Sequence, residues 1–207
     1  MGQYEQYLNY FSSKLGRRSF VLERGGGRVM LSAPHSAEQF RLGRPKYAEY
    51  ITGVIVKLIH DETGCPIIYK TKNCKDDANF DEKSRYKEKL KRYIDKNGIR
   101  YLFDIHQMNP TRVQNICVGT GRGANIKEEP AVLKRTLDAF SSRGIDGISV
   151  DEPFSAEYPF TVSSFIAREC GITCVQLEFN TRLVSKRYAE NKISETLASL
   201  KELVTEL

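Results

Sequence analysis

Ten residues near the N-terminus, VMLSAPHSAE at 29–38, combine a strand with two potential metal ligands. Residues 28–32 are predicted to form a short buried strand, which Pro34 ends. His35 therefore lies just beyond the C-terminal end of a strand, where open α/β sheets hold their ligands and catalytic groups. Glu38 follows three positions later, and zinc accepts both imidazole nitrogen and carboxylate oxygen. On these residues alone, a histidine that hydrogen-bonds a loop beside a solvated glutamate is an equal alternative.

Length and composition favour one globular domain that spans residues 1–207. The chain has 40% hydrophobic and 28% charged residues, which are ordinary values for a globular protein. No apolar run approaches the roughly 18 residues that a membrane-spanning helix needs. The first residues, MGQYEQYLNYF, lack the basic and then apolar pattern of a secretory signal. We therefore expect a cytoplasmic protein without a membrane partner.

The cysteines and the net charge narrow the class of protein further. The five cysteines form no C-x-x-C pair and several lie in apolar runs, so we expect buried free thiols rather than a thiolate metal site. The net charge of +6 would attract anions. Acidic residues are interleaved with the basic ones, as in DEKSRYKEKLKRYIDK at 81–96, which argues against a nucleic-acid surface. A small anionic partner is favoured instead.

Hydrophobic spacing predicts alternating helices and strands. Apolar residues at three- and four-residue steps predict helices over 3–15, 46–63, 81–96, 130–143, 161–170 and from about 188 onward. Runs rich in β-branched and aromatic residues predict strands over 20–23, 28–32, 66–71, 101–106, 115–120, 145–150 and 173–179. The glycines at 25–27 suit a hairpin-like turn between the first two strands. The alternation indicates a three-layer α/β sandwich with a central mixed, mainly parallel sheet.

Three reactive side chains come at or just beyond the C-terminal ends of apolar runs: His35, His106 and Glu178. A shared crevice forms at that edge of an open α/β sheet, so we expect them to lie close together. Glu178 is flanked by apolar residues in TCVQLEF, and a carboxylate near a core is costly without a partner charge or a metal. Asp104 precedes His106 by two residues on the same strand and therefore points to the same face.

These residue types suit a catalytic zinc site. Two neutral imidazoles and one carboxylate would leave a fourth zinc position open, which distinguishes catalytic from structural zinc. Zinc lowers the pKa of a bound water to about 7. A second glutamate can accept the proton and pass it to a leaving amine, and Glu178 is our candidate for this role. Asp104 would orient the imidazole of His106, although a plain structural acid fits the sequence equally well.

Several segments together resemble the N-formylglutamate amidohydrolase family, which is related to the zinc carboxypeptidases and the aspartoacylase-like deacylases. They follow the family order from about residue 29 to residue 187: APHS at 33–36, DDAN at 76–79, LFDIHQM at 102–108, ICVGTGRG at 116–123, VDEPFSAEYPFT at 150–161 and VQLEFNTRL at 175–183. The resemblance implies a phosphorylase/hydrolase-like α/β fold. It also implies that His35 and His106 bind zinc and that Glu178 is the catalytic carboxylate. The His-x-x-Glu pattern of the carboxypeptidases and deacylases adds Glu38 as a metal ligand.

Substrates of such families carry carboxylates, which arginine can bind through two parallel hydrogen bonds. Four arginines near the motifs, and one asparagine that matches a polar substrate-side position of the family, are the candidates: Arg44, Arg85, Arg112, Arg182 and Asn79. Arg182 lies in the same stretch as Glu178 and would either support that carboxylate or bind substrate. For each arginine, a solvated surface position is the competing interpretation.

The leading hypothesis is a zinc-dependent amide hydrolase that removes an acyl group from an acidic amino acid. The acyl group could be formyl, as in N-formylglutamate. A carboxypeptidase-type peptidase would keep the metal and exchange the substrate. A non-catalytic metal- or anion-binding module on the same fold is a hypothesis of another class. Such a module needs ligands but no proton acceptor, so Glu178 argues against it. A nucleic-acid binder is favoured only by the net charge of +6.

Overall fold

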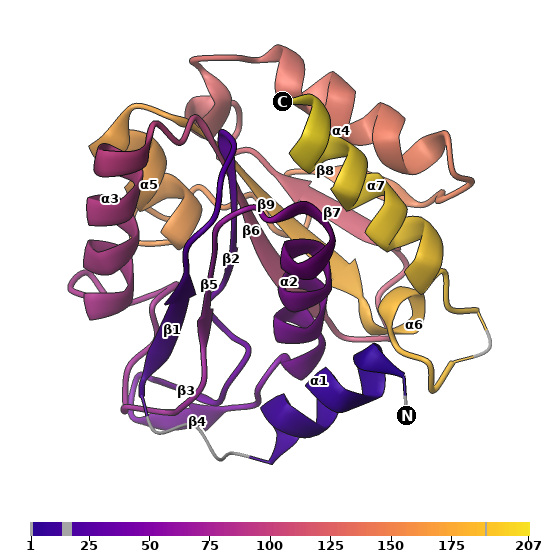
Figure 1. Ribbon diagram of the computed structural model, residues 1–207, viewed down its shortest axis with the longest axis horizontal. Helices are drawn as coiled ribbons and strands as arrows, with labels where there is room; N and C mark the ends of the chain where they lie inside the picture. The colour runs from indigo at the N-terminus through magenta and orange to yellow at the C-terminus, as the bar shows by residue number, and fades with distance from the viewer. Residues whose placement is uncertain (1, 14–17, 189) are drawn as a thin grey trace.

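A seven-stranded sheet forms the centre of the computed structural model, which describes residues 2–13, 18–188 and 190–207 (Figure 1). The strand order is β1-β5-β2-β6-β9-β7-β8, and β3 pairs with β4 in a separate sheet. The strands are β1 (Phe20–Glu23), β2 (Val29–Ala33), β3 (Gln39–Arg41), β4 (Arg44–Lys46), β5 (Ile67–Lys70), β6 (Tyr101–Met108), β7 (Ile116–Gly119), β8 (Ile148–Val150) and β9 (Thr173–Asn180). The helices are α1 (Gln3–Ser12), α2 (Tyr50–Thr63), α3 (Arg85–Asn97), the 3₁₀ helix η1 (Ala124–Ile126), α4 (Ala131–Ser141), α5 (Val162–Cys170), α6 (Thr181–Val184) and α7 (Ile193–Glu206).

Most neighbouring strands in the large sheet are parallel. Strands β5, β2, β6 and β9 run in one direction, while β7 is antiparallel to β9 and parallel to β8. Strand β1 closes the other edge antiparallel to β5. Helices α1, α2, α4 and α7 cover one face, and α3 and α5 cover the other (Figure 1). The predicted three-layer α/β sandwich with a mixed, mainly parallel sheet is confirmed.

Side chains alternate between the two faces of the sheet along the central strands. On the face covered by α3 and α5, they are apolar where the strands begin and polar where they end. In β6, Leu102 packs under α3 and α5, and Asp104 and His106 follow at two-residue steps on the same face. In β9, Cys174 belongs to the same apolar cluster, and Glu178 lies four residues further along that face. The two helices therefore cover the beginnings of these strands, and reactive side chains occupy their carboxyl ends.

The glycine-rich turn at 25–27 does not form the predicted hairpin. Strand β5 lies between β1 and β2, so β1 pairs with β5 and not with the strand that follows it in the chain. The turn passes close to the end of α2 instead: a Cβ on Gly25 would lie 2.0 Å from the carbonyl oxygen of Gly64. Only glycine permits this close approach.

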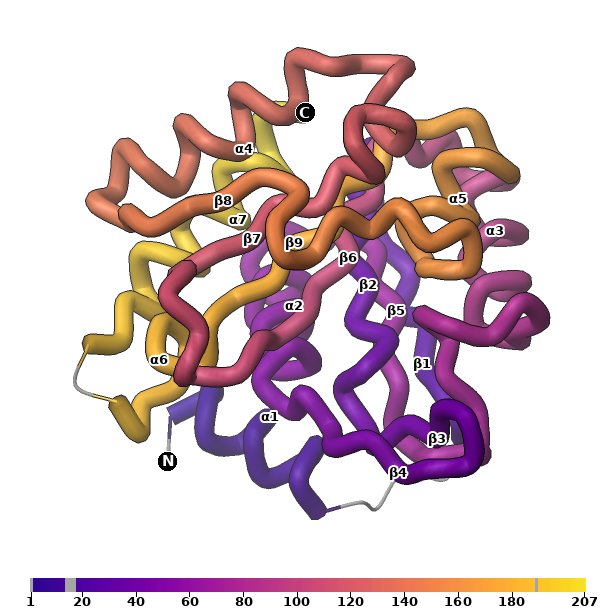
Figure 2. The backbone as a smooth tube through the Cα atoms, turned by 180° about the vertical axis from the view of Figure 1, so that it is seen from behind, coloured from indigo at the N-terminus to yellow at the C-terminus, as the bar shows by residue number. Residues whose placement is uncertain are grey.

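The chain between β2 and α2 forms the β3–β4 hairpin, which the sequence did not predict. The helix predicted from residue 46 begins at Tyr50, because Lys46 pairs with Gln39 in this hairpin. In Figure 2, the hairpin and the loop between β6 and β7 lie at the same edge of the large sheet. Both segments therefore border the polar ends of the central strands.

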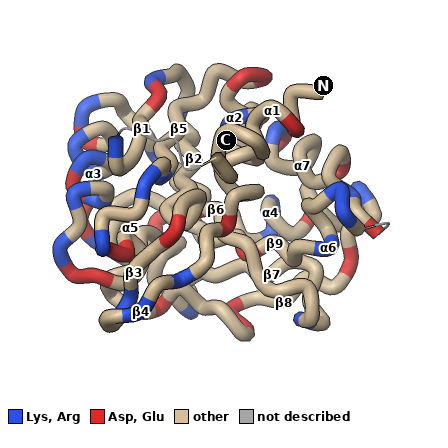
Figure 3. Tube along the Cα trace, turned by 90° about the horizontal axis from the view of Figure 1, so that it is seen from below, with Lys and Arg blue, Asp and Glu red and all other residues tan. Residues whose placement is uncertain are grey.

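The other predicted elements agree with the structure within a few residues. The helix predicted over 81–96 begins at Arg85, and the last helix begins at Ile193. Helix α1 ends at Ser12, and positions 14 and 15 of the predicted first helix lie outside the described residues. Acidic and basic residues are interspersed along α3 (Figure 3).

Two further expectations concern the cysteines and the membrane. The five cysteines are free, but only three are buried, since Cys74 is exposed and Cys170 is half-buried. Within the described ranges, no helix is long and apolar enough to cross a membrane.

Candidate metal centre and active site

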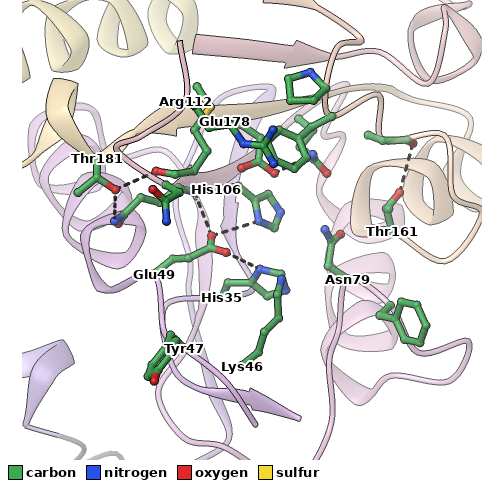
Figure 4. Close-up of a pocket in the computed structure, with 18 of the residues that line it drawn as sticks. His35, Lys46, Tyr47, Glu49, Asn79, His106, Arg112, Thr161, Glu178 and Thr181 are labelled. Atoms are coloured by element: carbon green, nitrogen blue, oxygen red, sulfur yellow. Dashed lines mark hydrogen bonds and ion pairs between the residues drawn. The ribbon is translucent and has the colours of Figure 1, made fainter. Parts of the chain in front are cut away.

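Two imidazoles and a carboxylate converge at the carboxyl edge of the sheet. Nδ1 of His35 lies 2.9 Å from Oε1 of Glu49, and Nδ1 of His106 lies 3.3 Å from Oε2 of the same carboxylate (Figure 4). One potential ligand atom from each residue lies within 4.8 Å of the others. The two imidazole side chains are only 3% and 1% exposed, so bulk water does not solvate these groups.

Each of the three residues reaches this point from a different element. His35 follows β2, Glu49 immediately precedes α2, and His106 lies near the end of β6. The backbone N–H of Glu49 donates to the carbonyl oxygen of His35 over 2.8 Å, which closes the excursion of the chain through the β3–β4 hairpin. The backbone N–H of Gln107 donates to Oε2 of Glu49 over 2.9 Å. These two bonds fix the carboxylate between the imidazoles.

A buried aspartate holds the other nitrogen of each imidazole. Nε2 of His35 lies 2.9 Å from Oδ1 of Asp77, and Nε2 of His106 lies 3.1 Å from Oδ2 of Asp104. An ionised carboxylate only accepts hydrogen bonds, so a neutral imidazole here keeps its proton on Nε2 and turns the lone pair of Nδ1 toward Glu49. Carboxylates in this position orient histidines that bind metals.

The arrangement fits a divalent cation. The two Nδ1 lone pairs and the Glu49 carboxylate face one another, and such donors repel unless a proton or a cation lies among them. Burial would lower the pKa of His106, but the carboxylates of Asp104 and Glu49 raise it well above its ordinary value. Burial would raise the pKa of Glu49, but His35 and His106 hold it well below its usual range. Two nitrogen donors and one oxygen donor suit zinc with an open fourth position.

Glu178 lies beside this group on the neighbouring strand. Its register partner in β6 is His106, the residue is 8% exposed, and Nε2 of Gln176 donates to its Oε1 over 3.1 Å. Burial is the main reason why the pKa of Glu178 is raised to about 7; His106 opposes this shift and Glu49 adds to it. A carboxyl group with a pKa near neutrality can take up a proton and release it within one reaction cycle.

The carboxylate that joins the two imidazoles is Glu49 and not the predicted Glu38. Glu38 precedes the β3–β4 hairpin and belongs neither to the converging group nor to the cavity wall. The His-x-x-Glu pattern assumes a short loop after the histidine, whereas here the hairpin separates His35 from the carboxylate by 14 positions. No fixed spacing marks Glu49, and its place directly before a strongly periodic helix is the one signal that the sequence offers.

A cavity of about 950 Å³ opens over these residues. Asn79 and Arg112, two of the predicted substrate residues, line it. Oδ1 of Asn79 accepts the backbone N–H of Val162 over 2.7 Å, which fixes this side chain against the start of α5. The guanidinium of Arg112 lies 5.3 Å from the centre of the Phe154 ring.

The other three predicted arginines do not line the cavity. Arg44 in β4 and Arg85 at the start of α3 are exposed to solvent. Arg182 donates to Oδ1 of Asn180 and to the carbonyl oxygen of Arg112, so it supports the loop that carries Arg112. Closeness to a motif in the sequence did not distinguish the arginines that line the cavity from those that do not, because the direction of each side chain decides this.

Two cations that the sequence analysis did not single out line the cavity instead, and both come from the β3–β4 hairpin. Arg41 pairs with Oδ2 of Asp77 over 2.7 Å. Burial would raise the pKa of Asp77, but His35 and Arg41 hold it well below its usual range. Lys46 lines the cavity and forms no ion pair with any residue in the described part of the chain.

No family model matches this sequence, and no curated protein is significantly similar to it in sequence. Solved structures do match the fold. A bacteriophage poly-γ-glutamate hydrolase superposes with a TM-score of 0.58 at 16% identity, over 94% of this chain and 92% of that one. An N-formylglutamate amidohydrolase from Ralstonia eutropha gives 0.55 at 12% identity, over 91% and 96%. A metallo-carboxypeptidase from Burkholderia cenocepacia gives 0.55 at 13% identity, over 97% of this chain and 67% of that one.

These similarities concern the fold. The chain has an α/β fold that it shares with an amidohydrolase and a metallo-carboxypeptidase, which is the fold implied by the segments at 33–36, 102–108 and 175–183. At identities of 12% to 16%, the substrate has to be argued from the site itself.

Proposed function

We propose that this protein is a metal-dependent amide hydrolase with zinc as the metal. It would remove an acyl group from the nitrogen of an acidic amino acid, with N-formylglutamate as an example of such a substrate. One observation carries the proposal: two oriented imidazoles and Glu49 converge, and a second buried carboxylate, Glu178, lies beside them in the same cavity. A binding module would need the first three groups but not the fourth.

The residues divide the chemistry among them. His35, Glu49 and His106 would hold the metal, and Asp77 and Asp104 would keep both imidazoles in the tautomer that binds it. The metal would supply Lewis acidity toward the substrate carbonyl and acidify a water molecule. Glu178 would accept a proton from that water as its oxygen bonds to the carbonyl carbon. The same carboxyl group would return the proton to nitrogen as the C–N bond breaks, which yields a carboxylic acid and a free amine.

Arg112 supports an acidic amine-side product. It lines the cavity, and Nδ2 of Asn180, at the end of the strand that carries Glu178, donates to its carbonyl oxygen over 3.1 Å. The leaving amine must lie near Glu178 to receive its proton. A carboxylate on the amino acid that is released would therefore lie close to Arg112, which could bind it.

Peptide hydrolysis is a second candidate, and the size of the cavity favours it. A volume of about 950 Å³ is near the upper end for pockets that hold drug-sized ligands, and a formylated amino acid would fill only part of it. A short acidic peptide would use more of the space with the same metal and the same Glu178.

A panel of substrates tests the proposal. Purified protein loaded with zinc is assayed on N-formyl and N-acetyl amino acids and on acidic dipeptides, with and without a chelator. We expect release of free amine from glutamate derivatives, loss of turnover with the chelator and recovery when zinc is added. Zinc binding without turnover on the whole panel would contradict the proposal and favour the non-catalytic module.

A further inference from the structure

Lys46 is a cation that the proposed reaction has not yet used. It lies at the end of β4, is half-buried and lines the cavity. Placing an ammonium group in a partly desolvated cavity is unfavourable unless an anion compensates for it. Within the described ranges of the chain, no carboxylate forms an ion pair with Lys46.

The acidic residues of the cavity already have other partners. Glu49 is held by the two imidazoles, and Glu157 pairs with Arg122. Glu178 accepts a hydrogen bond from Gln176, and the charge of Lys46 slightly lowers the pKa of Glu178 without an ion pair between the two. Arg41, from the same hairpin as Lys46, contrasts with it because Asp77 neutralises its charge. Of the two cations that this hairpin places in the cavity, Lys46 is therefore the one without an ion pair among the described residues and is available to an anion from solution.

The position of Lys46 relative to the reacting groups indicates which part of a substrate it meets. Lys46 extends alongside His35, whereas Arg112 lies on the side of Glu178 (Figure 4). The topology agrees, since the hairpin follows β2 while the Arg112 loop is bonded to the end of β9, and β6 lies between those two strands. Because the leaving amine must lie near Glu178, the acyl group extends toward His35 and Lys46.

We propose that Lys46 binds a carboxylate on the acyl group, so that the preferred substrate is an amide with an acidic group on each side of the scissile bond. This inference rests on the proposed amide hydrolysis and adds the acyl side to it. Two sources share this chemistry: an amino acid acylated by a dicarboxylic acid, and an acidic peptide. A formyl or acetyl group could not use Lys46.

The test compares two substrates of similar shape, N-succinylglutamate and N-(4-methylpentanoyl)glutamate, which differ in the carboxylate of the acyl group. We expect the zinc-loaded protein to favour the succinyl compound in kcat/KM by at least about tenfold, as a charge-assisted hydrogen bond would give. Lys46→Met should remove most of this preference through KM, and Lys46→Arg should restore part of it. Arg44→Met is the matched control, since it removes an exposed charge from the same strand outside the cavity. γ-Glutamylglutamate, assayed in parallel, distinguishes a peptide from a dicarboxylic acyl source.

Two results would overturn the inference. One is a wild-type protein that cleaves the 4-methylpentanoyl compound at least as well as both doubly acidic substrates. The other is a Lys46→Met variant that loses activity on all substrates equally in kcat, which would assign Lys46 to the charge that develops on the carbonyl oxygen. Zinc content and circular dichroism of the variant show whether the site and fold are intact. Failure of the amide hydrolysis itself is distinct, because the wild-type protein would then cleave none of the compounds.

Discussion

Each imidazole of the site has a carboxylate at both of its nitrogens. Glu49 faces the two Nδ1 atoms, and Asp77 and Asp104 face the two Nε2 atoms. The aspartates come from separate segments, a loop after β5 and the strand β6, yet they impose the same tautomer on their partners. This pairing explains why charged residues are tolerated at almost complete burial.

Removing one of these aspartates should weaken metal binding without abolishing it. Asp77→Asn keeps the shape of the side chain but removes the charge that holds His35, so we expect zinc affinity to fall by about 10- to 100-fold. Competition with a chromogenic chelator measures the dissociation constant. Asp95→Asn is the control, because Asp95 is exposed on α3, pairs with Lys91 and lies outside the cavity. Equal affinities for Asp77→Asn and Asp95→Asn would contradict a role for Asp77 in orienting His35.

The role of Glu178 can be separated from metal binding. Glu178→Gln keeps the hydrogen-bonding shape but cannot accept the proton, so we expect kcat to fall by about 10² to 10⁴-fold while zinc content is unchanged. Steady-state kinetics measure kcat, and elemental analysis of the same preparation measures the zinc content. Wild-type turnover in this variant would remove Glu178 as the proton acceptor.

At the scale of elements, helix α3 fixes the loops that bear the site. Lys87 is fully buried and donates to the carbonyl oxygens of Asp81 and Phe160 over 2.7 and 2.6 Å. Asp81 in turn accepts the backbone N–H of Asp77 over 2.8 Å. One side chain of α3 therefore connects the loop that carries Asp77 and Asn79 with the loop that leads into α5.

Lys87 should give the stability of the protein a characteristic pH dependence. Burial is the main reason why the pKa of Lys87 is lowered to about 8 from 10.5, and Asp81 offsets part of this effect. Between these pH values the unfolded chain binds more protons, so the free energy of unfolding should rise with pH, by about 3 kcal/mol from this group. Denaturant unfolding of the wild type and of Lys87→Met across this range should show the rise in the difference between them. Lys89→Met, which removes an exposed lysine of the same helix, should not change the profile.

The elements show which parts of a sequence carry enough signal for prediction. Helices such as α2, α3 and α7 and the buried strands β6 and β9 follow from periodicity and composition, because each buries a face of its own. Strands β3 and β4 have three residues each and are largely polar, with Pro45 in one of them, so no periodic signal marks them. The expected β1–β2 hairpin was wrong because pairing between distant segments overrides a local turn signal.

The same distinction explains which site residues were found. His35, His106 and Glu178 lie at the ends of apolar strands, where the chain order of an α/β sheet already places ligands. Glu49, Arg41 and Lys46 depend on the β3–β4 hairpin, and their convergence with the strands follows from tertiary structure alone.

At the scale of the whole molecule, the two helices on one face leave room for the site. Helices α3 and α5 cover the beginnings of the central strands, and the cavity opens over the carboxyl ends that they leave uncovered. A poly-γ-glutamate hydrolase and an N-formylglutamate amidohydrolase share this fold with the chain at 16% and 12% identity. The sheet therefore supplies the position of the centre, and on our proposal loops such as the β3–β4 hairpin supply the groups that distinguish substrates.

Zinc content measured by elemental analysis in matched variants is the most direct test of the account. Wild-type protein and Glu38→Gln should each bind about one zinc per chain after reconstitution and buffer exchange, whereas Glu49→Gln, like His106→Ala, should retain little. A Glu49→Gln variant with undiminished zinc, or a Glu38→Gln variant without it, would contradict the proposed centre and the hydrolysis that depends on it.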